Sequence, residues 1–483
     1  MTTSHSPATT ARRPATAWPL ESAVFSAAMV AQRLPWADAT ARALGLDALT
    51  REGVTRRLLQ HLRSSRSGRP VRLHTPFGSF LVPLATRDAE GLLARAEEVG
   101  ALGPASGLTA GGDRYGLSPH AAADGDVSVS AAELEALVAE DLDRVVAARR
   151  GDGTLEWRDW YRGMLRLARR VVVGAAAAED MLLSEVIAVA TTSADRRAYE
   201  ARAAALRRRL APHLADPDPA SLAGRLVAGG GDPQSAVPAV THALAVVSEA
   251  AAGTALQALA LLAVGAAASA EEAVDTALRR FPPVAAAVYP VRAPFVWEDV
   301  AVEAGTEILA ALAWLRRLES GEGGGGGDAP GGLCGAPAGC AATHFAARVA
   351  EAVVRGTTAV ARPVVISPRV TADRLPDTLD PRTLVVALGD LTALPGDGRV
   401  TVGMPTAVPV SAHGYAPAAY GALARASADR LERHAESLAA CAEHSGWNAD
   451  EAGERFRMVL LGHAERCATA ADGVRRAAKR LGD

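Results

Sequence analysis

The sequence predicts a mainly α-helical fold that carries small β-sheets. Alanine, glycine, leucine and valine dominate the composition, whereas aromatic residues make up only 4% of it. Apolar residues recur at helical spacing along most of the chain, and strict alternation is confined to a few short runs. Because alanine and leucine favour helices, helix should outweigh strand. An apolar content of 49% over 483 residues is sufficient for a large core.

The charge pattern and the cysteines exclude several classes of protein. The chain has 51 Lys and Arg against 54 Asp and Glu, with both signs mixed along most of its length. This pattern gives no basic stripe for nucleic acid, so no nucleic-acid partner is expected. Four cysteines do not form a disulfide framework. We therefore expect a soluble cytoplasmic protein.

Two segments could be mistaken for membrane or export signals. Residues 1–18 contain many hydroxyl side chains but no apolar core, and they predict a disordered tail rather than an export signal. The most apolar stretch, 236–270, exceeds the length of a membrane span. It is mostly alanine, however, and carries His242, Glu249 and Gln257 near its middle. A long buried helix is predicted, and no membrane partner is expected.

The first part of the chain alternates between helices and a small β-element. Short helices are predicted over 19–62, a β-hairpin over 69–85 with its turn at 76–78, and a helix over 85–102. Residues 107–126 are glycine-rich and predict a loop. Ser130 and Glu133 then form a capping box at the start of the next helix.

The second part is helical, with a short β-region and a C-terminal extension. Helices are predicted over 157–215 and 236–264, followed by β-rich runs, a glycine-rich linker over 318–332 and a strand pair over 362–389. Residues 415–483 predict a helical hairpin. The expected organisation is a tail (1–18), a main domain (19–395) and a C-terminal αα-hairpin extension (414–483).

The stretch GGLCGAPAGCAATHFAARV, residues 331–349, places Cys340 directly before a predicted helix. The positive end of a helix dipole lowers the pKa of a thiol there, which suits a metal-ligating thiolate. The same residue could be a small buried hydrophobe. Cys334 and Cys340 could also form a disulfide or a metal pair, although no second pair completes a zinc site. Residue type alone does not decide between these roles for Cys340.

Other candidate sites have weaker patterns. Ser118 and His120 could serve as nucleophile and base, but no G-x-S-x-G elbow exists and loop histidines are usually solvated. The run GEGGGGGD lacks the Lys-Ser or Lys-Thr of a phosphate-binding loop. The hairpin turn at Trp447 resembles WXG-type helical hairpins, but Asn448 and Ala449 depart from that motif. A packing or dimerisation hairpin is the simpler interpretation.

Three stretches, in the right order, resemble the cytochrome P-450 family of haem-thiolate monooxygenases. The first is SEAAAGTALQALALLA in the long apolar helix. The resemblance implies that Ala252, Gly253 and Thr254 face the oxygen site, with Glu249 as the acid. In this chain the acid precedes the small pair of residues, whereas the family pattern places it after them.

The second stretch, TALRRFPPVAAAVYPVRAPFVW, resembles the family's Glu-x-x-Arg helix and the strand that follows. Arg279 matches the motif arginine, but Thr276 stands where the family has glutamate. Asp275 is one position away, which is 100° of helical rotation, so it cannot simply substitute. Arg292 matches the arginine that binds a haem propionate, and a guanidinium suits a carboxylate.

The third stretch is the one that contains Cys340. The resemblance makes Cys340 the axial ligand of a haem iron, with Phe345 on the following helix and Leu333 where the family has a shielding phenylalanine. Ala336 replaces a loop glycine. His120 and Arg114, in the glycine-rich loop, are the remaining candidates for the second propionate.

Two functions follow from this resemblance, which covers roughly residues 70–390. The first is a haem-thiolate oxidoreductase, a divergent bacterial monooxygenase that acts on a small, fairly apolar substrate. It would need a separate electron-donor protein, because no flavin or iron-sulfur module is fused to it. The alternative is a haem-free family member that acts as a scaffold or auxiliary protein, with the C-terminal hairpin as its docking element. The replacements Thr276, Leu333 and Ala336 favour the alternative.

Overall fold

The computed structural model describes most of the chain. The described residues are 13–31, 51–76, 78–103, 105–109, 114–116, 129–147, 154–191, 196–228, 233–320, 341–376, 378–390, helical pieces between 428 and 443, and 451–482. The chain divides into two compact units, Met1–Gly403 and Met404–Asp483.

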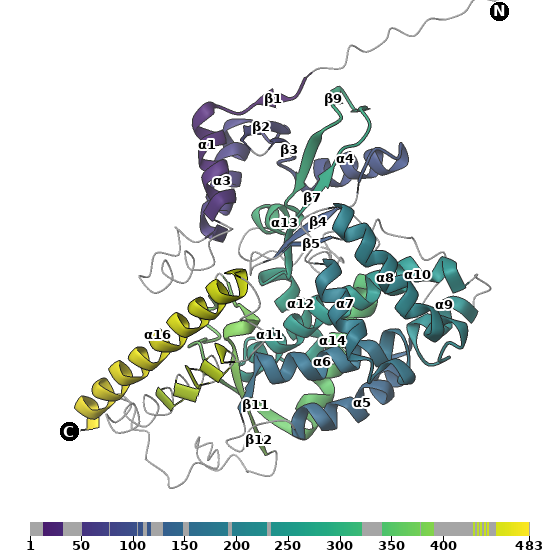
Figure 1. Ribbon diagram of the computed structural model, residues 1–483. Coiled ribbons are helices and arrows are strands. Elements are labelled where there is room, and N and C mark those ends of the chain that lie inside the picture. The colour runs from purple at the N-terminus through teal and green to yellow at the C-terminus, as the bar shows by residue number, and fades with distance from the viewer. Residues whose placement is uncertain are drawn as a thin grey trace, which may run out of the picture. The chain divides into compact units, whose positions relative to one another are not determined.

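Unit 1 is mainly helical, which confirms the predicted fold class (Figure 1). Its α-helices are α1 (Pro19–Ala31), α3 (Arg51–Ser65), α4 (Thr86–Glu98), α5 (Ala131–Ala147), α6 (Trp157–Val172), α7 (Met181–Thr191), α8 (Arg196–Ala215), α9 (Leu222–Ala228), α10 (Pro233–Ala245), α11 (Ala252–Ala263), α12 (Ala270–Arg280), α13 (Leu312–Ser320) and α14 (Ala341–Val360). Short 3-10 turns lie at Ala175–Ala177 and Pro381–Thr383.

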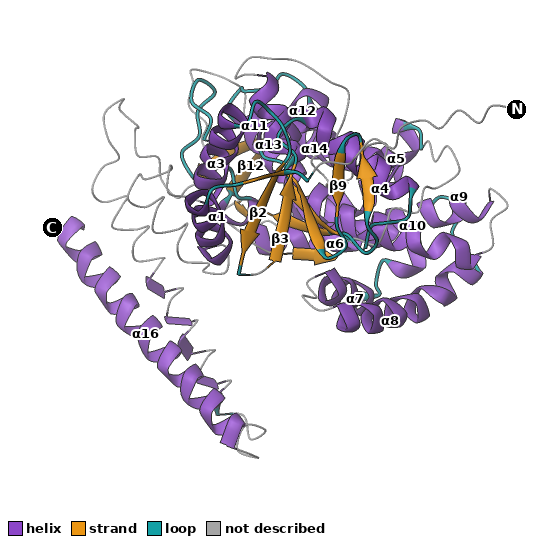
Figure 2. Ribbon diagram, turned by 90° about the horizontal axis from the view of Figure 1, so that it is seen from above, coloured by secondary structure: helices purple, strands orange, loops and turns teal. Residues whose placement is uncertain are grey.

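The largest sheet has seven strands in the order β1-β2-β3-β10-β7-β4-β5. They are β1 (Ala15–Thr16), β2 (Val71–Thr75), β3 (Gly78–Val82), β10 (Thr306–Ala310), β7 (Val284–Pro290), β4 (Ser106–Thr109) and β5 (Arg114–Gly116). The β1–β2 and β3–β10 pairs are parallel, and the other pairs are antiparallel. Helices α1 and α3 lie beside strands β2 and β3 (Figure 2).

Two smaller sheets complete the β-structure of the described residues. Strands β11 (Ala361–Ser367), β12 (Val385–Asp390) and β6 (Thr154–Glu156) form an antiparallel sheet, and β8 (Phe295–Trp297) pairs with β9 (Val300–Val302). The β11–β12 pair confirms the strand pair predicted over 362–389. Strand β6 joins this pair from more than 200 positions earlier in the sequence, and nothing in its own three residues predicts that pairing.

Two predicted features agree closely with the structure. The β2–β3 hairpin reverses direction between Thr75 and Gly78, which are paired across the two strands. The capping box is formed as predicted: the Glu133 N–H donates to Ser130 Oγ at 3.2 Å, and the Ser130 N–H donates to Glu133 Oε2 at 3.0 Å. These hydrogen bonds hold the pKa of Glu133 at about 2, first through the Ser130 hydroxyl, then through the Ser130 N–H and Arg225.

Two predictions about loops were wrong. Residues 107–109 and 114–116, in the expected glycine-rich loop, belong to strands β4 and β5, because β4 pairs with β7 and β5 pairs with β4 as the edge strand. The expected glycine-rich linker begins too early at 318, because Leu318–Ser320 complete helix α13. Residues 321–332 lie outside the described residues.

The long apolar stretch forms a nearly continuous buried helix, as predicted. It runs through α10, a π-helical turn at Val246–Ala251 and α11. Ser235–Ala263 is long and apolar enough to cross a membrane. However, 89% of an 18-residue apolar stretch within it is buried in the protein. Its apolar side chains are therefore accounted for by the core.

The apolar core of unit 1 has two parts. The larger part gathers α4–α12, α14 and their strands around the long helix. The smaller part packs α1 and α3 against the outer strands of the large sheet, with Phe25 against Phe80 edge to face at 5.4 Å between ring centroids. Unit 2 contains α16 (Glu451–Gly482) and helical pieces between 428 and 443. Its buried residues include alanines at seven-residue spacing, namely Ala428, Ala435, Ala442, Ala464 and Ala471.

Candidate functional site

The long helix, which carries Glu249, Ala252, Gly253 and Thr254, packs against α14, which carries Phe345. We call this contact the helix seam: the π-turn Val246–Ala251 and α11 on one side, and α14 on the other. Helix α14 begins at Ala341, so the predicted helix starts directly after Cys340. Cys340 itself lies outside the described residues. Phe345, one turn into α14, is buried in the core.

The π-turn holds Glu249 and directs its side chain to α6. A π-turn contains one extra residue, which rotates the side chains within it relative to a regular helix. The Tyr161 hydroxyl donates a hydrogen bond to Glu249 Oε1. One residue away, Trp160 Nε1 donates to the Ala252 carbonyl at 2.8 Å. Glu249 and Ala252 therefore both lie on the side of the long helix that faces α6.

Thr254 lies on a different side of the same helix. Thr254 comes two residues after Ala252, which corresponds to about 200° of rotation around the helix. Thr254 is fully buried, and its hydroxyl has no hydrogen-bond partner among the described residues. The buried hydroxyl of Ser248 also has no hydrogen-bond partner among the described residues. Glu249 and Thr254, which the sequence groups together, thus face different surroundings.

Leu379 and Pro381 contact another side of α11. Gln257 Nε2 donates to the Leu379 carbonyl at 2.6 Å, while Gln257 Oε1 is buried without a partner among the described residues. A Cβ atom at Gly253 would lie 3.3 Å from Pro381 Cγ. Glycine at 253 therefore permits the close approach of Pro381 to α11.

Arg292 follows strand β7 and is exposed. Its backbone N–H donates to the Ala101 carbonyl at 2.7 Å, which fixes its position. The guanidinium has no ion-pair partner among the described residues, so it is available to a carboxylate. A Cβ at Gly103 would lie 2.7 Å from Arg292 Nε and 2.9 Å from Pro290 Cγ. Glycine at 103 therefore provides the space in which the Arg292 side chain lies.

Arg279 pairs with Asp275, the residue expected not to substitute for the family's glutamate. Its guanidinium forms an ion pair with Asp275 one helical turn earlier and donates to Thr276 Oγ1 at 3.3 Å. Both members of the pair are exposed. Asp275 and Arg279 are four residues apart and therefore adjacent on the helix surface. The Asp275–Arg279 pair is thus a surface interaction, and Asp275 does not restore a buried glutamate.

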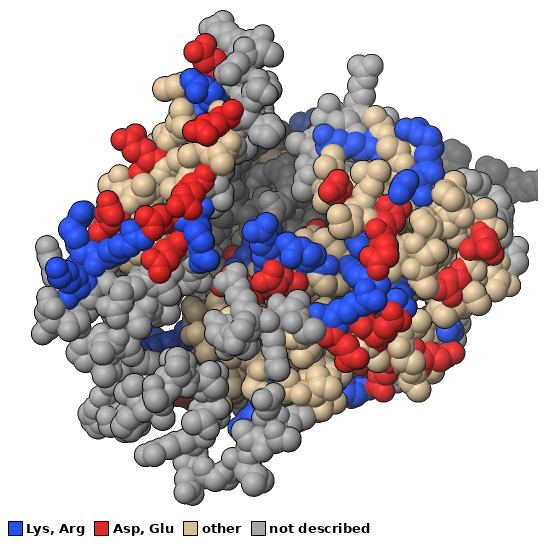
Figure 3. All heavy atoms as spheres, turned by 60° about the horizontal axis from the view of Figure 1, so that its bottom comes forward, with Lys and Arg blue, Asp and Glu red and all other residues tan. Residues whose placement is uncertain are grey.

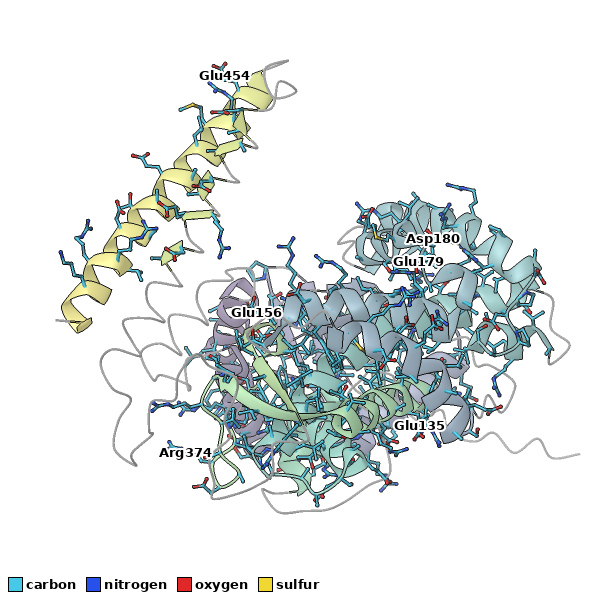
Figure 4. All side chains as sticks on the ribbon, turned by 90° about the horizontal axis from the view of Figure 1, so that it is seen from below. Glu135, Glu156, Glu179, Asp180, Arg374 and Glu454 are labelled. Carbon is cyan, nitrogen blue, oxygen red and sulfur yellow. The ribbon has the colours of Figure 1, made fainter. Side chains whose placement is uncertain are left out.

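A charged network joins α5, α6 and the turn before α7. Asp141 is almost completely buried between Arg166 and Arg170, with 3.0 Å from Arg170 Nε to Asp141 Oδ2. Glu179 and Asp180 lie next to one another (Figure 4), and Arg166 lowers the pKa of Glu179 by a hydrogen bond and by its charge. Acidic and basic side chains are interspersed on the face in Figure 3. The acidic and basic side chains of the network around Asp141 neutralise one another, so we interpret this network as structural.

Several predicted site residues cannot be placed. Cys334, Leu333, Ser118 and His120, like Cys340, lie outside the described residues, and for Arg114 the structure gives only a backbone position on β5. Among the described residues, no group of three or more His, Cys, Asp or Glu side chains could hold a metal ion.

Sequence reasoning missed the residues that fix the long helix. Trp160 and Tyr161 belong to the run WRDWY, residues 157–161, which is unusual in a chain with so few aromatic residues. Trp157 stacks on Tyr161 at 5.0 Å between ring centroids. The concentration of aromatic side chains was the available signal, but only the fold shows that they reach the π-turn.

The comparisons with known proteins give structural neighbours only. No protein-family model matches the chain, and no curated protein matches its sequence. The chain is similar to solved structures of cytochromes P450, the family that the sequence resembles. One is CYP101J2, with 16% identity over 69% of this chain and 94% of that protein and a TM-score of 0.48. Others are a six-coordinated cytochrome P450 from Thermus thermophilus (18% identity, 69% and 98% covered, TM-score 0.46) and the open cytochrome P450 Eryk from S. erythraea (17%, 70% and 98%, 0.45).

Proposed function

We propose that the protein is a haem-thiolate oxidoreductase, a cytochrome P-450-like monooxygenase that acts on a small, fairly apolar substrate. The observation that carries the proposal is the helix seam. It joins a helix that starts directly after Cys340 to a long apolar helix containing a buried hydroxyl, Thr254, without a partner among the described residues. A buried hydroxyl without a hydrogen bond costs about 1–3 kcal/mol, so its retention fits a ligand that bonds to it.

Two described residues offer groups that a haem site would use. Thr254 offers a hydrogen-bonding group in an otherwise apolar helix, and Arg292 offers a guanidinium with no ion-pair partner among the described residues. Cys340 would supply the thiolate to the iron and Arg292 would bind a propionate. Glycine at 103 would leave Arg292 room to do so, since a Cβ there would overlap the guanidinium. Haem would supply one-electron and oxygen chemistry to the seam.

The chain's own residues would then bind, orient and exclude water. The Thr254 hydroxyl would hold a water molecule or an oxygen-containing ligand in place by a hydrogen bond. Tyr161 would keep Glu249 on the α6 side, so Glu249 would act on Thr254 only through intervening groups. The residues of α11 are mostly apolar, which would suit a small apolar substrate beside this helix. Electrons would come from a separate donor protein, and the expected location is the cytoplasm.

One observation favours the haem-free alternative. The family helix motif places its arginine in a buried ion pair, whereas Arg279 and Asp275 form theirs on the surface. A family member that no longer binds haem could retain the helical fold and lose the buried ion pair. In that case the protein would act as a scaffold, with residues 414–483 as its docking element.

The deciding experiment measures haem uptake and thiolate ligation. The protein is produced with haem supplied, reduced and exposed to carbon monoxide, and the Soret region is recorded. We expect a thiolate-type band that is lost in Cys340→Ala. Cys334→Ala tests the other cysteine of the same stretch, and Cys467→Ala, in unit 2, is the matched control. Both should keep the band.

The outcomes test haem binding, the identity of the cysteine ligand and the role of Arg292. Absence of haem uptake in the folded wild-type protein would overturn the proposal and leave the haem-free alternative. Loss of the band in Cys334→Ala but not in Cys340→Ala would move the ligand to Cys334. Arg292→Gln should weaken haem retention without shifting the band, because it changes a propionate contact and not the axial ligand.

A further inference from the structure

We propose that helix α1 is an interfacial helix that binds an anionic lipid surface. The inference does not depend on haem or on the helix seam. It departs from the expectation that the chain has no membrane partner, and it involves surface binding only.

The outward face of α1 is apolar. Leu20 is 73% exposed and Val24 is 39% exposed. Ala23 and Ala27 are exposed as well, so positions 20, 23, 24 and 27 form one continuous stripe at helical spacing. Trp18, directly before the helix, is 66% exposed. A surface helix ordinarily turns its apolar stripe to the core, and α1 presents one to solvent.

The inward face of α1 is held firmly on unit 1. Phe25 is buried and packs against Phe80 of β3. Glu21 is also buried, and it accepts hydrogen bonds from the Trp18 N–H at 2.7 Å and from Arg66 at 3.1 Å. Burial alone would raise the pKa of Glu21, but these bonds and His61 together lower it. The helix therefore cannot simply rotate to bury its apolar stripe.

Residues 1–76, the segment that contains α1, are rich in arginine. Four of these arginines are in ion pairs, Arg13 and Arg72 with Glu303, Arg63 with Glu319, and Arg66 with Glu21. Residues 1–76 contain 11 arginines and four acidic residues, whereas the rest of the chain has 40 Lys and Arg against 50 Asp and Glu. The Arg66 guanidinium lies 5.6 Å from the centroid of the Trp18 ring. Arg57 and Arg69 are exposed and have no ion-pair partner among the described residues. An apolar stripe, an exposed tryptophan with an arginine beside it, and an arginine-rich segment are features of helices that lie on anionic membranes.

Charge also decides between a lipid surface and a second copy of the chain. In a symmetric dimer through α1, two basic segments would face one another and repel. An anionic lipid surface offers both opposite charge and an apolar layer for Leu20 and Val24.

The experiment measures co-sedimentation of the full-length protein with vesicles. Vesicles of phosphatidylcholine with phosphatidylglycerol are compared with vesicles of phosphatidylcholine alone, at low salt and at about 0.5 M salt, where screening is strong. We expect binding to the anionic vesicles that falls with salt. The double variant L20S/V24S should bind roughly tenfold more weakly or worse, because it loses most of the apolar contact. The control V296S/I366S alters two exposed apolar residues on other elements and should bind like wild type.

Three results would overturn the proposal. They are no binding of wild type to anionic vesicles, equal binding by L20S/V24S, and a wild-type dimer in solution that L20S/V24S converts to monomer. Circular dichroism melting checks that both double variants remain folded. Because Cys340→Ala should bind vesicles like wild type, failure of the haem proposal would leave this result unaffected.

Discussion

The buried hydroxyls of the long helix are the most informative residues in this protein. A threonine inside a helix commonly donates to the carbonyl four residues earlier, as Thr357 of α14 does to Val353 at 2.7 Å. Thr254 makes no such bond among the described residues, although it is fully buried. The Thr254 hydroxyl therefore lacks a hydrogen bond that a bound ligand would supply.

Replacing this hydroxyl with a methyl group should stabilise the ligand-free protein. Thr254→Val keeps the shape of the side chain and removes the unpaired polar group, so we expect about 1 kcal/mol of added stability in denaturant unfolding. Thr357→Val, equally buried but with its hydrogen bond satisfied, is the control and should lose stability by about the same amount. Destabilisation by Thr254→Val would mean that its hydroxyl already has a partner.

Glu351 of α14 should make stability depend on pH. Burial raises its pKa above the ordinary value, and the nearby charge of Glu271 raises it further. The folded state therefore favours the protonated form, and stability is lost as pH rises through the raised pKa. Glu351→Gln should melt at a higher temperature than wild type at pH 7. This difference should disappear below about pH 4, where the carboxyl is protonated in both states. A constant difference across this range would rule out ionisation as the cause.

At the scale of elements, close helix packing decides which glycines can be replaced. A Cβ at Gly163 of α6 would overlap Val145 Cγ2 of α5. Valine is stiff at χ1 and cannot easily move aside. The same helix carries Trp160 and Tyr161, so its position on α5 also sets their contacts with the π-turn.

Gly163→Ala should therefore destabilise the protein even though alanine favours helices. We expect a loss of about 1–3 kcal/mol in chemical denaturation, because overlap in a packed core outweighs helix propensity. Gly473→Ala in α16 is the control: nothing lies within 4 Å of its Cβ position, and it should be neutral or stabilising. Equal effects of the two substitutions would show that α5 and α6 have room to separate.

At the scale of the molecule, the two units have separate cores. The two apolar clusters of unit 1 include no described residue of unit 2. We expect that removing residues 404–483 leaves the cooperative unfolding of unit 1 within about 2 °C of its original midpoint, measured by circular dichroism. A larger decrease would show that unit 2 contributes to the stability of unit 1.

The sequence by itself determined the mainly helical class, the β2–β3 hairpin, the capping box at Ser130 and the long buried helix. These features depend on local period and on residues a few positions apart, which can be read along the chain. The helix that begins after Cys340 was predictable for the same reason.

Only the tertiary structure decided what depends on distant residues. Tyr161 and Trp160 lie about 90 positions before their partners Glu249 and Ala252, and strand β4 exists because β7 pairs with it. The surface pairing of Arg279 with Asp275 and the exposure of the apolar stripe on α1 likewise depend on which helix face the fold buries. Periodicity shows that a helix has an apolar face, but only packing determines whether the core or solvent meets it.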